Sequence, residues 1–244
     1  MREKVYARDL RSYGATAFGA GGCRARAALG AAMALVITSV LGGCMQATLN
    51  PVWDANFTAR DKQQLTNPPY QQAWISPAYQ RQVVQYHRKE APGSILVDTD
   101  GRYVYYVLPG GKAIRYGAIV GEDGQAWSGV ATVGRKEEWP GWTPTEGQKR
   151  RLGPLPNYVE GGARNPMGAR GLYLYAGGKD TLYRIHGTNQ PGWIGHAISS
   201  GCIRLTNEDI IDLYSRVKMG ASVIVLGSRQ DASRLASAGS SHSN

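Results

Sequence analysis

The sequence is poor in the residues that several kinds of site require. Its 244 residues include three cysteines, four histidines and two phenylalanines. A structural zinc site usually repeats cysteine and histidine at short spacings, and that pattern is missing here, so zinc is disfavoured. The few phenylalanines contrast with 14 tyrosines and 6 tryptophans, and 32 glycines with 12 prolines supply many turns. This composition suits a turn-rich β-protein with wet aromatic surfaces.

The sequence also lacks an apolar run long enough for an ordinary membrane span. The uninterrupted small and apolar run at residues 27–41 has about 15 residues, whereas a spanning helix needs roughly 20. It follows a basic segment and ends in Leu41-Gly42-Gly43-Cys44, which resembles the processing box of bacterial lipoproteins. We expect residues 1–43 to be a lipoprotein-type signal peptide and Cys44 to carry the lipid. An ordinary signal peptide or a short membrane anchor is the alternative.

The remaining chain divides by composition into a linker, a domain and a tail. Residues 44–91 contain Asn-Pro and Ser-Pro pairs and many glutamines, which predicts a tether. A short helix is possible within it, over residues 77–90. We expect a folded domain over residues 92–227 and a flexible Ser- and Ala-rich tail over 228–244.

Within the predicted domain, short β-prone segments alternate with glycine- and proline-rich turns. This pattern predicts an all-β sandwich or barrel. A capping pattern at Thr206 predicts one helix that stops at Gly220. The Pro-, Gly- and Trp-rich stretch at 138–167 interrupts the pattern, and we expect it to flank a site as a wall or lid, or else to be a plain surface loop. The expected strands are 94–98, 102–108, 113–120, 127–136, 171–175, 181–185 and 222–226.

Cys202 is the one cysteine expected to remain as a free thiol. Cys23 lies in the predicted signal peptide and Cys44 is the predicted lipid acceptor. Exported proteins normally pair their cysteines, so a lone thiol suggests a chemical role. A buried, inert cysteine is the alternative.

A nucleophilic thiol needs a base or a positive neighbour to form the thiolate. His87 and His242 fall outside the predicted core, so His186 and His196 remain as candidates. His186 ends an apolar, β-branched run and precedes Gly187, which fixes its position better than the loop fixes His196. We therefore predict His186 as the base and His196 as a loop or substrate-contact residue.

The residues around Cys202 complete a possible thiol site. Small residues precede it in a turn whose backbone N–H groups could stabilise an oxyanion. Arg204 follows two positions later and could hold a carboxylate, or form a structural salt bridge. The segment reads Ser199-Ser200-Gly201-Cys202-Ile203-Arg204.

This segment, preceded by His186-Gly187-Thr188, resembles the signature of the L,D-transpeptidase family with its YkuD-type catalytic domain. The resemblance covers about residues 92–227 and includes Trp139-Pro140 and the Asn-Pro-Met-Gly run at 165–168. One departure is Ser200, where many members carry histidine. The resemblance implies a mainly β fold, an L,D-transpeptidase-type β-sandwich with one or two short helices.

The resemblance also implies a substrate, the peptidoglycan stem peptide, and a role for each residue. Cys202 attacks the carbonyl before the fourth-position D-alanine, His186 moves the proton, and the Gly187 carbonyl orients the imidazole. The resulting thioester reacts with an amine of a second stem to form a 3→3 cross-link, without cofactor or metal. Gly201, Ser199 and Ser200 form the oxyanion turn, and the expected substrate-binding residues are Arg204, Thr188, His196 and Trp193.

The sequence leaves the acceptor open. Water in place of the amine gives an L,D-carboxypeptidase, and a protein amine gives attachment of an outer-membrane protein to peptidoglycan. A cell-wall-binding lipoprotein without turnover is the non-enzymatic alternative. We expect a periplasmic protein anchored through Cys44, with the outer membrane favoured because Met45 is not an acidic retention signal. The net charge of +10 fits either an anionic wall or a solvated surface, and the export signal disfavours nucleic acid.

Overall fold

A computed structural model describes residues 55–122, 125 and 127–227. The predicted signal peptide, the lipidation site Cys44 and the predicted tail lie outside the described residues. Within the described part, no helix is both long and apolar enough to cross a membrane.

The described residues form a mainly β fold, as predicted, with three α-helices rather than one or two. The helices are α2 (Ala59–Thr66), α3 (Glu146–Leu152) and α4 (Asn207–Arg216), with 3₁₀ turns at Pro77–Tyr79 and Pro191–Trp193. The strands are β1 (Gln82–Gln85), β2 (Ile95–Asp98), β3 (Tyr103–Leu108), β4 (Lys112–Gly117), β5 (Val120–Gly121), β6 (Gly129–Glu138), β7 (Arg170–Ala176), β8 (Lys179–His186), β9 (Ala197–Ser199), β10 (Ile203–Arg204) and β11 (Ser222–Val225).

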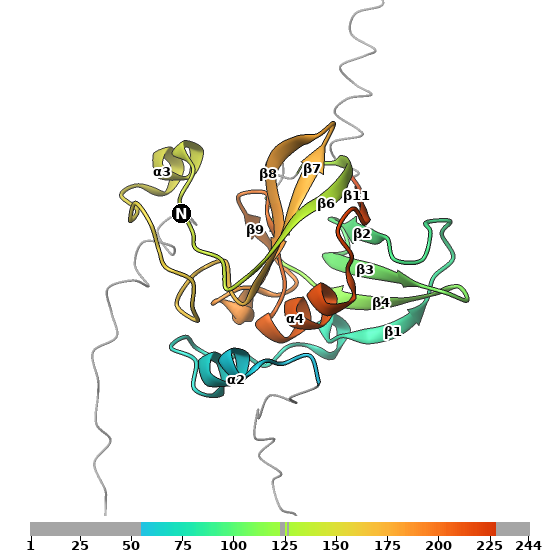
Figure 1. Cartoon of the computed structure of the whole chain (residues 1–244), viewed down its shortest axis with the longest axis horizontal. Helices are drawn as coiled ribbons and strands as arrows, with labels where there is room; N and C mark the ends of the chain where they lie inside the picture. The colour runs from blue at the N-terminus through green and yellow to red at the C-terminus, as the bar shows by residue number, and fades with distance from the viewer. Residues whose placement is uncertain (1–54, 123–124, 126, 228–244) are drawn as a thin grey trace, which may run out of the picture. The chain divides into compact units, whose positions relative to one another are not determined.

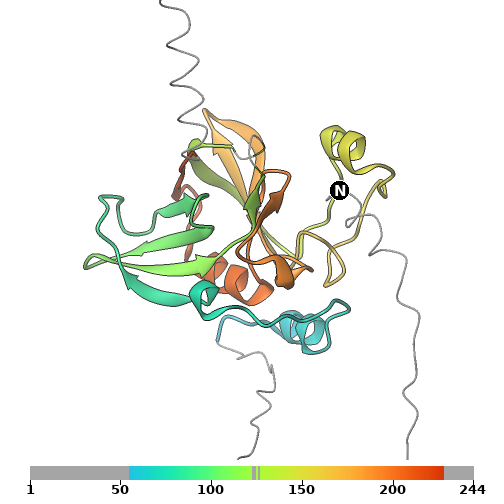
Figure 2. The same ribbon diagram turned by 180° about the vertical axis from the view of Figure 1, so that it is seen from behind.

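Nine of the described strands hydrogen-bond in the order β1-β4-β3-β2-β11-β6-β7-β8-β10, and β5 pairs separately with β9. The chain of strands bends into two layers: β6, β7 and β8 rise steeply, while β1, β3 and β4 run across them, and α4 lies at the foot of the bend (Figures 1 and 2). Most neighbours are antiparallel, but three pairs run parallel: β2 with β11, β5 with β9, and β8 with β10. The β8–β10 pair lies at one edge of the nine-stranded sheet. That parallel pair carries the predicted thiol site.

The core explains why these segments are strands. Leu172 and Leu174 of β7, Ile185 of β8 and Ile203 of β10 all belong to one buried apolar cluster. Successive strand side chains point to opposite faces, so the residues that alternate with these are directed away from the core. Helix α4 adds its buried Ile210, and its first turn is capped by Thr206, whose Oγ accepts from the Asp209 N–H at 3.1 Å.

The N-terminal segment differs from its prediction in two ways. The predicted helix over 77–90 is wrong: residues 82–85 form β1, because Val83 and Val84 pair with β4 and the backbone bonds to a neighbouring strand override a weak helical pattern. The predicted tether also ends earlier than residue 91. Phe57 and Leu65 are buried in the main apolar cluster, so the segment from Phe57 onward belongs to the folded unit.

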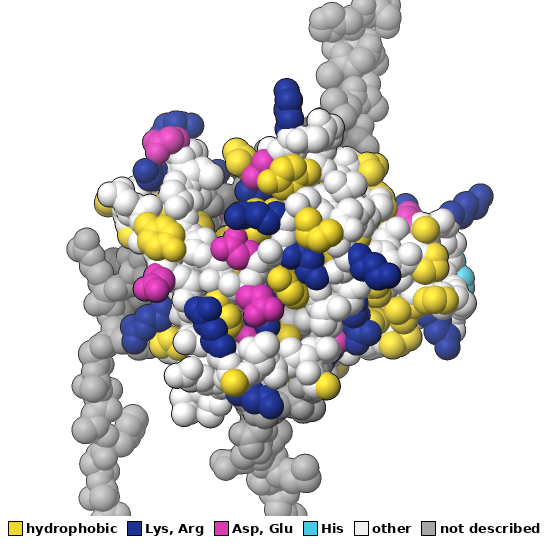
Figure 3. All heavy atoms as spheres, in the orientation of Figure 1, with side chains coloured by type: hydrophobic (Ala, Val, Ile, Leu, Met, Phe, Trp, Pro, Cys, Tyr) yellow, Lys and Arg dark blue, Asp and Glu magenta, His cyan; other side chains and the backbone are white. Residues whose placement is uncertain are grey.

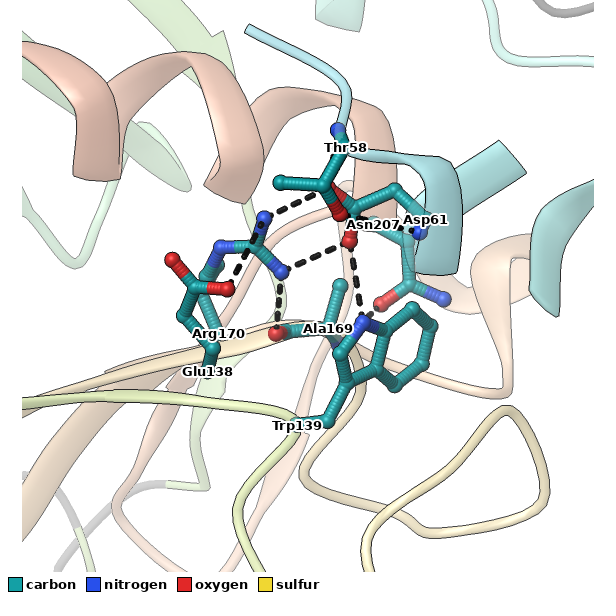
Figure 4. A network of polar contacts seen from close by, with 7 residues as sticks. All are labelled: Thr58, Asp61, Glu138, Trp139, Ala169, Arg170 and Asn207. Atoms are coloured by element: carbon teal, nitrogen blue, oxygen red, sulfur yellow. Dashed lines mark hydrogen bonds and ion pairs between the residues drawn. The ribbon is translucent and has the colours of Figure 1, made fainter. Parts of the chain in front are cut away.

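A buried ionic cluster joins this segment to the sheet (Figure 4). Both carboxylate oxygens of Asp61 accept from the Arg170 guanidinium, at 2.8 and 2.6 Å. Asp61 also accepts from the Trp139 indole at 2.9 Å and forms a capping box with Thr58. Burial raises the pKa of Asp61, but the hydrogen bonds from Arg170 and Thr58 outweigh it, so that pKa is below its usual value. We call Thr58, Asp61, Trp139 and Arg170 the ionic anchor.

The stretch at 138–167 is ordered by its own contacts. It contains α3, which sequence reasoning missed, and an antiparallel bridge between Trp142 and Val159. Arg151 at the end of α3 donates to the Gln125 side chain at 2.8 Å, and the Gln125 carbonyl lies against Gly201. The stretch at 138–167 is therefore connected, through Gln125, to the turn that carries the predicted nucleophile.

The surface does not gather its positive charge into one patch on the face seen in Figure 3. There, Lys and Arg side chains lie among Asp and Glu side chains and polar surface. This dispersal fits a solvated surface better than a broad anion-binding face.

Candidate active site

The parallel pairing of β8 and β10 sets the predicted base and nucleophile on neighbouring strand ends. In the register, Ile203 lies opposite Ile185 and Arg204 opposite His186, so Cys202 comes one position before the paired segment. Ile185 and Ile203 face the core, and the alternation of side chains directs His186, Cys202 and Arg204 to the other face. Two residues 16 positions apart in sequence are thereby placed on the same face of neighbouring strand ends.

His186 is held as a neutral imidazole. Its Nδ1 lies 2.7 Å from the Gly187 carbonyl oxygen, and a carbonyl can only accept, so Nδ1 carries the proton and Nε2 is left with its lone pair. Burial, followed by the positive charge of Arg204, lowers the pKa of His186 to about 3, against hydrogen bonds to the Gly187 and Met167 carbonyls that act to raise it. The arrangement matches a base in its unprotonated form.

Cys202 is a free, partly exposed cysteine. Burial raises the pKa of its thiol, while a backbone hydrogen bond from Arg184 and the charges of Arg204 and Arg184 act in the opposite direction. At rest the pair is therefore a thiol beside a neutral imidazole. A proton must pass to the imidazole when the sulfur attacks.

Ser199 braces the turn before Cys202. Its Oγ donates to the Cys202 carbonyl at 2.6 Å and accepts from the Gly201 N–H at 3.1 Å. Gly201 has φ +115°, and a Cβ there would collide with the Tyr183 ring and the Gln125 carbonyl, so only glycine fits. The Gly201 N–H, part of the predicted oxyanion turn, is thus already engaged by Ser199. Ser200 is half-buried beside this turn.

Arg204 is buried, with 8% of its surface exposed. Its backbone pairs with Ile119 in both directions, at 2.8 and 2.9 Å. Among the described residues no carboxylate pairs with its guanidinium, in contrast to Arg184, which is held by Asp180 at 2.6 and 2.8 Å. The described residues thus provide no salt bridge for Arg204, and its role as a carboxylate clamp stays a prediction.

The other predicted substrate-binding residues differ in accessibility. Thr188 is 1% exposed and its Oγ accepts from the Gln190 N–H at 3.0 Å, which does not support its prediction as a substrate contact. Trp193 and His196 are exposed and pack edge to face at 5.5 Å. They lie together on the loop that leads into β9, before the nucleophile turn.

Sequence reasoning missed two residues at the base of the site. Asn207 was predicted only as part of a helix start, yet it is buried and bonds to the backbone on both sides of the His186 loop. Tyr70 lay in the predicted tether, yet its hydroxyl accepts from Asn207. Asn207 follows directly after the capping Thr206, so the sequence pattern identified it only as part of the helix start. Among the described residues no group of three or more metal-ligating side chains occurs.

The family described as the YkuD L,D-transpeptidase catalytic domain matches residues 92–225, which is more than half of this chain. The chain belongs to the L,D-transpeptidase catalytic domain family. The match includes His186, Cys202 and Arg204 and begins after α2 and β1. The ionic anchor therefore joins this domain to residues that precede it in sequence.

Two relatives from Escherichia coli strain K12 illustrate the likeness. The chain is 37% identical over 141 residues to the "Probable L,D-transpeptidase ErfK/SrfK", covering 54% of this chain and 43% of the relative. It is 45% identical over 95 residues to the "Probable L,D-transpeptidase YbiS", covering 37% of this chain and 29% of the relative. The chain thus spans less than half the length of these curated relatives.

Among solved structures, a Brucella melitensis protein titled a probable carnitine operon oxidoreductase is 44% identical, with 62% of this chain and 96% of that chain covered. The TM-score of this pair is 0.42.

Proposed function

We propose that this protein is a cysteine-dependent peptidoglycan L,D-transpeptidase that forms 3→3 cross-links with release of D-alanine. One observation supports the proposal: Cys202 and His186 lie on adjacent strand ends in the β8–β10 register, and the buried His186 has its Nδ1 2.7 Å from the Gly187 carbonyl oxygen. A thiol, a base and a group that orients the base are the parts that nucleophilic acyl transfer needs.

In the first half-reaction, His186 Nε2 takes the proton of the Cys202 thiol as the sulfur attacks the carbonyl carbon between the third residue of the stem and D-alanine. The tetrahedral oxyanion is stabilised by the backbone N–H of Cys202, since that of Gly201 is bonded to Ser199. The C–N bond then breaks, and the imidazolium gives its proton to the departing D-alanine amine. A thioester on Cys202 remains.

In the second half-reaction, the side-chain amine of a third-position residue on another stem attacks the thioester. His186 takes a proton from that amine, the C–S bond breaks, and the proton returns to the sulfur. The product is a 3→3 cross-link and the free thiol. Water in the same place gives a trimmed tripeptide, and a protein amine gives a protein attached to the wall.

Arg204 supports this chemistry through its charge. A guanidinium buried without a carboxylate partner is suited to a carboxylate of the stem peptide. That contact would offset the positive charge that depresses the His186 pKa, so substrate binding would raise the basicity of His186. Binding and activation of the nucleophile are coupled in this scheme.

The same proposal extends to location, as an expectation from sequence. Processing before Cys44 and lipidation of that residue would anchor the enzyme at the periplasmic face of a membrane, with the outer membrane favoured. The wall lies within reach of a protein anchored there. Metabolic labelling with a fatty acid, compared between wild type and Cys44→Ala, tests this part separately.

Muropeptide mass spectrometry tests the reaction. Purified wild type, incubated with disaccharide tetrapeptides, is expected to yield 3→3 dimers, free D-alanine and a transient mass increase on Cys202. Cys202→Ala is expected to yield none of these while keeping the wild-type circular dichroism spectrum and melting temperature.

The other outcomes separate the alternatives. Dimers formed by Cys202→Ala would overturn the cysteine mechanism. Tripeptide without dimers would identify a carboxypeptidase. Wild type that retains the tetrapeptide without acylation or turnover would indicate a wall-binding lipoprotein.

A further inference from the structure

We propose that Asn207 is a positioning residue for the base, because its side-chain amide ties the Ala169 backbone to the Thr188 backbone, next to the Gly187 carbonyl that hydrogen-bonds to the His186 ring. The proposal rests on the proposed function for its catalytic meaning. Its geometric part concerns the orientation of His186 and can be tested without turnover.

The three hydrogen-bond partners of the Asn207 side chain identify which of its amide atoms is the oxygen and which is the nitrogen. Oδ1 accepts from the Ala169 N–H at 2.8 Å. Nδ2 donates to the Thr188 carbonyl at 3.0 Å and to the Tyr70 hydroxyl at 2.9 Å. A backbone N–H can only donate and a carbonyl can only accept, so the amide has one possible orientation. Asn207 is 1% exposed, where an unsatisfied amide would be costly.

The chain around this amide is built for close approach. A Cβ on Gly168 or on Gly187 would collide with Asn207 Oδ1, and one on Gly168 would also meet the Gly187 and Thr188 backbone at 2.6 Å. Gly168 has φ +63°, a conformation that glycine adopts readily. The two glycines thus let two loops close on a single side chain. Such a three-way contact fixes their separation.

Those two loops hold His186. The Thr188 carbonyl, held by Asn207, belongs to the residue after Gly187, whose own carbonyl lies 2.7 Å from His186 Nδ1. On the other side, the Ala169 N–H that Asn207 accepts from follows Gly168, whose backbone packs against that of Gly187 and Thr188. Asn207 therefore fixes the Gly187–Thr188 backbone, and with it the carbonyl that hydrogen-bonds to His186 Nδ1. Without the Asn207 amide, the imidazole of His186 would no longer be held in one orientation, so the Nδ1–H would lose its fixed hydrogen bond and Nε2 its fixed position.

Tyr70 extends this support beyond the family domain. Its hydroxyl is the third partner of the Asn207 amide, and it lies before the matched residues 92–225. Burial, the largest cause, raises the pKa of Tyr70 to about 12, so the hydroxyl keeps its proton at neutral pH. The segment between the predicted lipidation site Cys44 and the matched domain thereby contributes to the orientation of the base.

The experiment uses ¹⁵N-histidine-labelled full chain and compares wild type with Asn207→Asp, Asn207→Ala and Tyr70→Phe. Asp is isosteric but cannot donate to the Thr188 carbonyl. We expect the wild-type His186 ring to show a single Nδ1–H tautomer, and the two Asn207 variants to show mixed tautomers. We expect kcat to fall about tenfold to a hundredfold with KM within about twofold, because displacement of a catalytic group acts on the reaction step. Tyr70→Phe is expected to lose less than about threefold, since two of the three bonds remain.

Val104→Ala is the control for a merely structural effect. Val104 is a fully buried core residue on β3, and its truncation destabilises the fold without touching the His186 loops. It should leave the tautomer unchanged. The proposal is overturned if Val104→Ala shifts the tautomer as Asn207→Ala does, or if Asn207→Ala keeps the wild-type tautomer and kcat.

The two proposals fail differently. If wild type forms no cross-links but Asn207→Ala still disturbs the His186 tautomer, the positioning role stands and the proposed function fails. Should Asn207→Asp not fold, Asn207→Ala and Tyr70→Phe still decide between the outcomes.

Discussion

Two buried polar centres, the ionic anchor and the candidate active site, differ in how the charge of their arginine is balanced. In the ionic anchor, the Arg170 guanidinium is met by both oxygens of Asp61. In the candidate active site, the Arg204 guanidinium has no carboxylate partner among the described residues, and its charge lowers the pKa of both His186 and Cys202. The Gly187 N–H donates to the Arg170 carbonyl at 3.1 Å, so the two centres share a backbone contact.

This difference in charge pairing predicts different roles, stability for the ionic anchor and reactivity for Arg204. A buried ion pair such as Asp61–Arg170 is strongly destabilised when one partner is removed, because the other charge is left buried. A buried cation without a partner instead keeps its charge available, here for a thiolate or for a substrate carboxylate. We therefore expect substitutions in the anchor to change the free energy of unfolding, and substitutions at Arg204 to change reactivity.

The largest stability effect is expected for Asp61→Asn. The change removes the buried two-point partner of Arg170 and leaves it only the half-exposed Glu138 carboxylate at 3.9 Å, so the free energy of unfolding should fall by about 3–5 kcal/mol at pH 7. Urea unfolding followed by fluorescence measures it. Asp180→Asn is the matched control: Asp180 binds Arg184 in the same two-point geometry but is one-third exposed, and its loss should cost less than about 1 kcal/mol.

The pH dependence of this effect follows from the lowered pKa of Asp61. A carboxyl whose folded-state pKa lies below its unfolded value of 3.8 contributes fully above pH 3.8 and loses that contribution as pH falls through the folded pKa. The difference between wild type and Asp61→Asn should thus be constant from pH 5 to 8 and shrink in acid. Equal losses in the anchor variant and its surface control would remove the contrast between the two centres.

A smaller effect, and one on reactivity, is expected for Arg204→Gln. Loss of the charge raises the pKa of the Cys202 thiol, so the pH profile of iodoacetamide alkylation should move to higher pH. Loss of the carboxylate contact should lower kcat/KM about tenfold to a hundredfold, or about 1.4–2.7 kcal/mol. Arg135→Gln, on the exposed face of β6, should change neither. An unchanged alkylation profile in Arg204→Gln would contradict an electrostatic role.

The sequence predicted those features that depend on local pattern. The hairpins from β2 to β4 follow from alternating side chains and Gly-rich turns, and α4 follows from the Thr206 cap. Cys202 and His186 could be chosen because one lone thiol and one well-placed histidine remained after the signal and tail were set aside. Each of these inferences needed only neighbours in sequence or a simple count.

The missed features depend on partners that are distant in sequence. The burial of Asp61 is meaningful only with Arg170, which is 109 residues away, so α2 looked like part of a tether. β1 became a strand because β4 was available to pair with it. Asn207 has partners on three separate segments, and a capping pattern cannot show where its side chain points. Long-range pairing was therefore the information that the sequence pattern lacked.

The smallest expected effect tests how finely the anchor is balanced. In Trp139→Phe, the indole donor to Asp61 is lost, but both oxygens of the carboxylate stay bound to Arg170. The cost should be about 1–2 kcal/mol, one hydrogen bond to a charged group plus a small loss of packing. Trp142→Phe, at a half-buried position of the same loop, should cost less. A loss in Trp139→Phe as large as in Asp61→Asn would mean that indole packing, rather than charge pairing, dominates the ionic anchor. Charge pairing would then no longer explain why the ionic anchor stabilises the fold while Arg204, which has no carboxylate partner among the described residues, affects reactivity.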